Sequence, residues 1–192
     1  VPPLLKRFSV LALCVLVAWY AHSPLLGAGF LGSDAAVLDD IDRAYQEGGA
    51  TAPWSVDAVD HRPLAATALG ISRSLHARGG IYTPGDAGRV RLDSLLMHVV
   101  AAFGVRSVVI RSMRPWTGDD HARSAGAAAG AFLMVHPLLV PVVAHLPSRG
   151  DVVGLAASAW SVAFLLRGRQ SRNAIELGVA FVLAVVAAAS SP

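Results

Sequence analysis

Three carboxylates follow directly after a long apolar run near the start of the chain. The stretch GFLGSDAAVLDD, residues 29–40, contains Asp34, Asp39 and Asp40. A carboxylate within hydrogen-bond reach of a hydroxyl can remove its proton as that hydroxyl attacks, which is general-base catalysis. An ordinary surface helix would show the same pattern, with Asp39 paired to Arg43 across one turn and Asp34 as the first-turn acid. The residues alone leave both interpretations open.

His98 and Arg106 are ionisable residues inside a predicted apolar helix. Such residues are unfavourable in a bilayer core, so each is a functional hypothesis by default. A neutral histidine can equally hydrogen-bond to a neighbouring helix, and an arginine can extend its charged group toward the membrane surface. The sequence therefore allows a binding role or a structural role for each.

The stretch HPLLVPVVAHLPSRGDVV, residues 136–153, joins two apolar runs. Pro137 disfavours helical geometry at His136, so we expect the preceding helix to end there. Arg149 and Asp151 come just before the next apolar run, where an aspartate suits the N-terminal end of a helix. Without further information this segment is a plain interhelical loop.

The distribution of charge predicts a membrane protein. The 192 residues are 54% hydrophobic and only 15% charged, whereas soluble domains carry roughly 25% charged residues. No Asp, Glu, Lys or Arg occurs in residues 8–33, 124–148 or 177–192. A bilayer core needs about 20 mostly apolar residues per helix. We therefore predict an integral, multi-pass protein in contact with the lipid bilayer.

The predicted fold is all-α, a polytopic membrane helix bundle with about five transmembrane helices. They are expected at about residues 8–26, 92–110, 125–139, 152–166 and 174–189. A large acidic first loop, 27–91, contains a short interfacial helix at 63–75. Basic residues cluster at 6–7, 111–123 and 167–172, so the positive-inside rule predicts a cytoplasmic N-terminus and a non-cytoplasmic first loop. The chain starts with Val and stops after an apolar run, so we expect it to be the N-terminal part of a longer one.

The sequence lacks the motifs of several classes of soluble enzymes and binding proteins. The sequence contains no P-loop, GxGxxG, GxSxG or HExxH motif. Its single cysteine, Cys14, excludes an internal disulfide and a cysteine-based zinc site. The basic residues are spread between apolar runs rather than gathered on one face, so we predict no nucleic-acid partner. No metal-binding residues are predicted from spacing.

Five stretches, in order, resemble motifs of the membrane domain of GT-C glycosyltransferases, and more narrowly of the tetratricopeptide-repeat O-mannosyltransferase-like family. Their residues are Gly29-Phe30 with Ser33-Asp34, then HRPL from His61 to Leu64, SLLMH from Ser94 to His98, His136-Pro137 with Val142-Val143, and Arg149-Gly150-Asp151. The resemblance covers most of residues 25–170. Counted from Gly29-Phe30, the acidic pair of that family falls on Ser33 and Asp34, not on Asp39 and Asp40.

The resemblance implies transfer of a mannose-like sugar from a polyprenyl-phosphate donor to a protein or glycan acceptor on the non-cytoplasmic face. Asp34 would be the catalytic base. The expected substrate-binding residues are Arg62, His61, His98, His136, Arg149 and Asp151. Arg62 and Arg149 suit the leaving phosphate, because a guanidinium binds its oxygens in a bidentate manner. No cofactor is certain, and a divalent metal is possible.

Two other classes of function remain open. Ser33 replaces one acid of the pair and Pro141 replaces a usual glutamate, which favours a non-catalytic membrane scaffold or degenerate transferase. A transporter would use His98 and Arg106 on its path, but it predicts an inverted repeat, which the sequence does not show.

Overall fold

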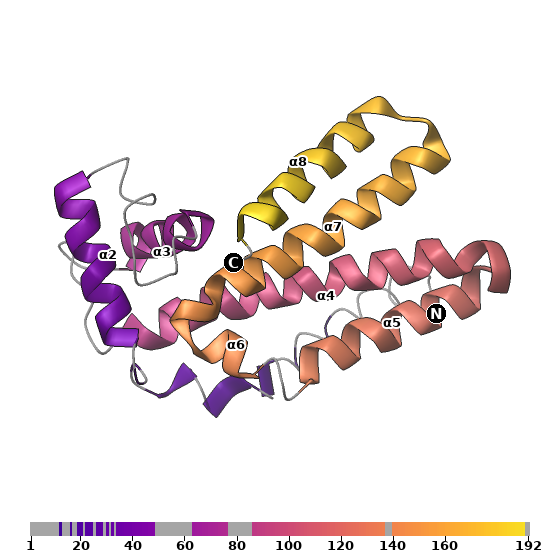
Figure 1. The fold of residues 1–192 in the computed structure, drawn as a ribbon. Helices are drawn as coiled ribbons and strands as arrows, with labels where there is room; N and C mark the ends of the chain where they lie inside the picture. Colours follow the sequence, from indigo (N-terminus) through magenta and orange to yellow (C-terminus); the bar gives the residue numbers. More distant parts are fainter. Residues whose placement is uncertain are drawn as a thin grey trace.

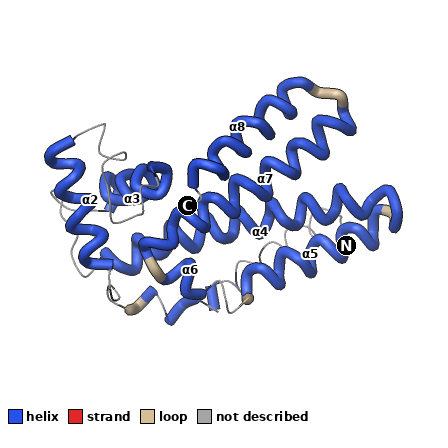
Figure 2. The backbone as a smooth tube through the Cα atoms, viewed as in Figure 1, coloured by secondary structure: helices blue, strands red, loops and turns tan. Residues whose placement is uncertain are grey.

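The computed structural model describes residues 34–48, 63–76, 86–136 and 140–190, together with individual positions between 12 and 32. Every regular element in these residues is a helix, as Figure 2 shows. The all-α prediction is therefore confirmed for the described part of the chain. Its helices are α2 (Asp34–Gly48), α3 (Pro63–His76), α4 (Ala87–Thr117), α5 (Asp119–Val135), α6 (Val140–Ala144), the 3-10 helix η5 (Leu146–Ser148), α7 (Arg149–Ser171) and α8 (Ala174–Ser190).

Two antiparallel helical hairpins form the body of the structure (Figure 1). One pairs α4 with α5 and the other pairs α7 with α8, and the hairpins join where α4 packs against α7. The first hairpin turns at Gly118, whose φ of 77° lies in the left-handed region that favours glycine. The second turns at Arg172, which also has a positive φ of 52°. Short α2 and α3 lie near the start of α4, at the end away from both turns.

Local sequence accounts for the ends of these helices. Pro63 is the first residue of α3, where its missing N–H group is not needed. Helix α5 ends at Val135, because His136 precedes Pro137 and adopts an extended backbone with ψ of 122°. Asp119 and Asp120 occupy the first turn of α5. Their negative charges interact favourably with the positive end of the helix dipole and so stabilise this terminus.

The helix boundaries differ from those expected from hydropathy. Helix α4 spans 87–117 rather than 92–110, α5 spans 119–135 rather than 125–139, and α7 spans 149–171 rather than 152–166. Charged and polar residues extend α4 and α7 at both ends and α5 at its N-terminal end, whereas α5 ends four residues earlier than expected. A short helix was expected at 63–75 and is present as α3, and the last helix lies at Ala174–Ser190 as expected.

The first loop, expected at 27–91, contains α2, α3 and the first turn of α4. The predicted helix 8–26 lies mostly outside the described residues, although the positions within it that are described are helical. Among the described residues, two helices are long and apolar enough to cross a membrane, α4 and α7, while α8 is apolar but shorter. The five-span bundle is therefore not confirmed.

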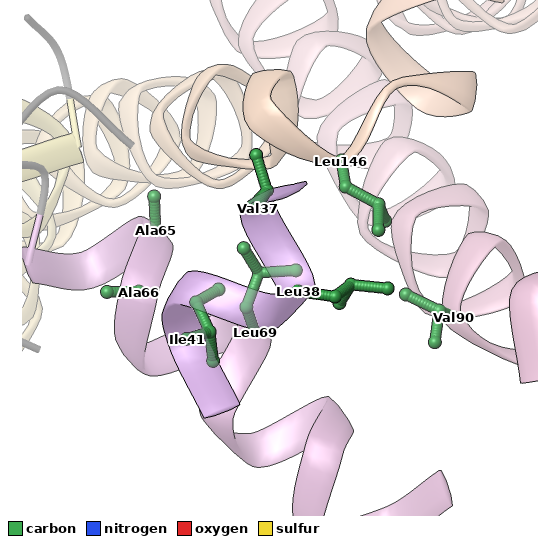
Figure 3. Close-up of a cluster of buried hydrophobic side chains, with 8 residues drawn as sticks. All are labelled: Val37, Leu38, Ile41, Ala65, Ala66, Leu69, Val90 and Leu146. Atoms are coloured by element: carbon green, nitrogen blue, oxygen red, sulfur yellow. The ribbon is translucent and has the colours of Figure 1, made fainter. Parts of the chain in front are cut away.

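A compact apolar core holds the small helices to the start of α4 (Figure 3). Its buried side chains are Val37, Leu38, Ile41, Ala65, Ala66, Leu69, Val90 and Leu146. They come from α2, α3, α4 and η5, which are far apart in the sequence. This burial stabilises the contact between the acidic first loop and the helical hairpins.

Gly104 allows α4 to approach α7 closely. A Cβ atom at this position would lie 2.8 Å from the Cβ of Ala159 and 3.3 Å from its carbonyl carbon. Neither atom belongs to a flexible side chain, so the helices would have to separate.

We expect Gly104→Ala to lower the free energy of unfolding. Overpacking contributes about 1–3 kcal/mol of destabilisation, more than the roughly 0.5–1 kcal/mol that alanine gains over glycine within a helix. Gly178→Ala is the matched control, since no atom lies within 4 Å of a Cβ built on this glycine. Thermal unfolding in detergent measures both variants. Equal or higher stability of Gly104→Ala would show that the α4–α7 contact is looser than described.

Candidate functional site

Asp34 lies in a buried ion pair rather than on an open surface. It is the first residue of α2 and its side chain is 0% exposed, while that of Arg91 in α4 is 1% exposed. The Arg91 Nη2 and Asp34 Oδ2 atoms are 3.5 Å apart. The backbone N–H of Leu146 also donates to Asp34 Oδ1 at 3.1 Å. The carboxylate therefore joins α2, α4 and η5.

The remaining donors of Arg91 reach backbone carbonyls. Its Nε donates to the carbonyl of Ala144 at 3.1 Å and its Nη1 to that of Ala28 at 2.5 Å. A guanidinium has five N–H donors, and a buried one stabilises the fold only when these are satisfied. Arg91 thus connects the segment before α2, the start of α4 and the end of α6.

Asp93 forms a second polar cluster two residues along α4. Ser72 donates to its Oδ2 at 2.6 Å, His76 Nε2 lies 3.1 Å from both carboxylate oxygens, and Arg149 Nη2 lies 3.3 Å from Oδ2. Arg149 is itself buried and also donates to the carbonyl of Val90 at 2.9 Å. The Asp93 side chain remains 26% exposed. This carboxylate, unlike Asp34, can be reached from outside.

An open cavity of about 210 Å³ lies beside the Asp93 cluster. Asp93, Ser72 and Arg149 contribute the polar part of its wall. The rest of the wall is apolar and consists of Ala68, Ile71, Leu75, Leu96, Met97 and Val153, from α3, α4 and α7. A mostly apolar cavity with a few converging polar groups is the usual form of a small-molecule site.

Two histidines lie near the end of α5, His98, which belongs to the predicted site, and His22, which does not. His98 Nε2 is 3.1 Å from the carbonyl of Leu133, and His22 Nε2 is 3.3 Å from that of Met134. The two rings meet edge to face at 5.8 Å. The last carbonyls of a helix lack intrahelical partners, so these contacts satisfy the C-terminal end of α5. The hydrogen bond of His98 to a neighbouring helix fits the structural interpretation of this residue.

The other predicted residues do not join one site. The ring of His136 packs against Phe132 at 4.8 Å, and Asp151 is an exposed acid in the first turn of α7. His61 and Arg62 lie outside the described residues. Of the predicted set, Asp34 belongs to the buried pair, Arg149 to the Asp93 cluster and His98 to the end of α5.

Sequence reasoning missed Asp93, Ser72 and His76. Asp93 is an acid at the edge of an apolar run, and charge inside such a run signals a functional residue. Asp93 is the second residue of the helix predicted at 92–110, close to its boundary. Ser72 and His76 are four residues apart and share a face of α3, but nothing in the sequence indicates which helix they meet.

The family resemblance makes a divalent metal possible. Within the part of the chain that the structure describes, no group of three or more His, Cys, Asp or Glu side chains is arranged to bind a metal ion.

Comparison with known proteins identifies no relative of this chain. No family model, no curated protein and no solved structure matches this chain. The resemblance to GT-C glycosyltransferases remains an inference from short motifs.

Removing the carboxylate of Asp34 should strongly destabilise the fold. Asp34→Ala leaves the buried Arg91 charge without its partner, and breaking a buried pair in this way lowers the free energy of unfolding by about 3–5 kcal/mol. Asp40→Ala is the control: its pair with Arg43 spans 3.8 Å at the surface, and the Arg43 side chain is 66% exposed, so we expect a change within about 1 kcal/mol. Chemical denaturation of both variants provides the measurement, and equal stabilities would contradict the ion pair.

Proposed function

We propose that this chain is a membrane glycosyltransferase that moves a sugar from a polyprenyl-phosphate donor to a hydroxyl of a protein or glycan at the non-cytoplasmic face. The observation that carries the proposal is that Asp34, from the first stretch that resembles a GT-C motif, contacts residues that neighbour two of the other stretches. These partners are Arg91, three residues before SLLMH, and Leu146, three residues after Val142-Val143. Arg149 of the RGD stretch bonds to Val90 one residue away from Arg91.

Helix length and surface composition support a membrane location. With 31 residues, α4 is about 46 Å long, which exceeds the roughly 30 Å hydrocarbon core of a bilayer. Large apolar side chains are exposed along α8, including Ile175 at 76% and Phe181 at 71%. Contiguous apolar surface of this kind favours contact with lipid or another protein.

The placement of charge supports the proposed orientation. The α4–α5 turn carries Arg111, Arg114 and Arg123, and the α7–α8 turn carries Arg167, Arg169 and Arg172. Both turns lie at the end of the molecule away from α2 and α3 (Figure 1). Basic residues are enriched on the cytoplasmic side, so α2, α3 and the two polar clusters belong to the opposite side.

In this proposal Asp34 accepts the proton of the acceptor hydroxyl while that oxygen attacks the anomeric carbon. The bond from the sugar to the donor phosphate breaks, and the phosphate departs with the bonding electrons toward an arginine. Because Asp34 is 0% exposed, the acceptor reaches it only after the η5 segment at Leu146 has moved aside. Arg149, and Arg62 outside the described residues, are the cations proposed for the phosphate. Arg149 is paired with Asp93 in the structure, so it binds the phosphate only after this ion pair has opened.

A non-catalytic membrane scaffold is the second candidate, favoured by a specific observation. The Asp34 carboxylate is enclosed, paired with Arg91 and bonded to the Leu146 N–H. These are the contacts of a residue that stabilises a fold. Under this alternative the ion pair stabilises the fold and no sugar is transferred.

Labelling of single cysteines tests the orientation. In a Cys14→Ser background, Trp116→Cys and Gln170→Cys mark the two hairpin turns, and Glu47→Cys marks α2; all three positions are exposed. We expect a membrane-impermeant maleimide to label Glu47→Cys from outside intact cells, and the other two only after permeabilisation. Labelling of all three from one side would contradict the membrane-crossing arrangement.

Sugar transfer from a polyprenyl-phosphate-linked donor tests the activity. We expect Asp34→Asn to reduce transfer roughly 10²–10⁴-fold, the usual contribution of a general base, and Asp40→Asn to leave it unchanged. Rates are normalised to folded protein, since Asp34 also stabilises the structure.

Arg91→Gln separates the two roles of Asp34, because it breaks the same ion pair but keeps the carboxylate. An equal loss in Asp34→Asn and Arg91→Gln per folded molecule would assign Asp34 a structural role only. The absence of transfer by the unmodified full chain would favour the scaffold.

A further inference from the structure

The cavity beside Asp93 has the features of a binding site for a neutral, apolar molecule that carries a hydroxyl group. It lies between α3, α4 and α7, away from the enclosed Asp34–Arg91 pair. We propose that such a molecule binds here, with its hydroxyl donating to the carboxylate of Asp93. The proposal does not depend on sugar transfer, because it rests on this cavity alone.

The size of the cavity limits the group that it can hold. An enclosed apolar cavity of about 150 Å³ in another protein accepts benzene. The 210 Å³ found here therefore suits a substituted ring or a short branched chain. At its rim the apolar side chains of Ile71 and Leu75 are 57% and 68% exposed, and Leu96 is 55% exposed. A longer apolar body can continue across these residues.

The hydrogen bonds of Asp93, which lines the cavity, leave part of its acceptor capacity unused. Ser72 and Arg149 both contact Oδ2, whereas His76 Nε2 lies at 3.1 Å from each oxygen. An ionised carboxylate offers about four acceptor positions. Oδ1 therefore accepts from His76 alone among the described residues, so that it can take one further donor from a ligand.

Charge balance selects a neutral ligand. Arg149 lies 3.3 Å from Asp93 and is almost completely buried, so the pair carries no net charge. Beside this neutral pair the attraction and the repulsion of a charged ligand largely cancel, so such a ligand would lose its hydration without a net electrostatic gain. A hydroxyl loses less hydration and still donates to an ionised acceptor, which is one of the stronger hydrogen bonds.

Fluorine NMR can test the proposal with four small probes: 4-fluorophenol, fluorobenzene, 4-fluorobenzylamine and 4-fluorobenzoate. The full chain is titrated in detergent, and Ala68→Phe, which adds bulk to the cavity wall and leaves the residues of the polar cluster unchanged, is titrated under the same conditions. The difference between the two proteins removes the contribution of probes that partition into the micelle.

We expect 4-fluorophenol to bind the unmodified chain at least roughly tenfold more tightly than fluorobenzene, because of the hydrogen bond to a charged acceptor. Ala68→Phe should abolish binding of both probes. Asp93→Asn should reduce the preference for the phenol, whereas Asp119→Asn, an acid at the α4–α5 turn, should leave it unchanged.

Three results would overturn the proposal. Equal affinity for fluorobenzene and 4-fluorophenol would show that Asp93 does not recognise the hydroxyl. Binding that survives Ala68→Phe would place the probe outside the cavity. Tighter binding of the amine or of the benzoate would show that the site selects a charged ligand.

Discussion

The buried ion pair between Asp34 and Arg91 is the constraint on which the rest of the structure depends. Moving two charged groups from water into the protein interior is unfavourable unless they form an ion pair and their remaining hydrogen bonds are satisfied. Arg91 satisfies this requirement with Asp34 and with the carbonyls of Ala28 and Ala144. These partners come from segments that are far apart in the sequence, so the pair fixes how the acidic first loop and the HP segment meet α4. The apolar core of Figure 3 then packs around this arrangement.

Two polar centres, the Asp34–Arg91 pair and the Asp93 cluster, involve residues from one turn of α4. Residues two apart in an α-helix point roughly 200° away from each other, so Arg91 and Asp93 face different neighbours. Arg91 meets the buried Asp34, whereas Asp93 meets α3 and the start of α7 beside an open cavity. Arg149 links the two centres, because it bonds both to Asp93 and to the carbonyl of Val90.

This division between an enclosed and an accessible carboxylate bears on function. A group that does chemistry must meet its substrate, and in the structure Asp93 has access to the outside while Asp34 has none. The transferase proposal therefore requires movement of the η5 segment, and the scaffold alternative requires none. A ligand site at Asp93 is compatible with either, since it needs only the fixed packing of three helices.

The sequence alone determined the helical class, the presence of long apolar segments and the ends of some helices. Pro137 ended α5 and Pro63 began α3 because these effects act within a few residues. It also indicated that Asp34 begins a helix. Only the tertiary structure decided that Asp34 is buried against Arg91 and that Ser72, His76 and Arg149 surround Asp93. Burial and ion pairing depend on which helix faces join across long sequence separations, and a single sequence carries no local signal for that choice.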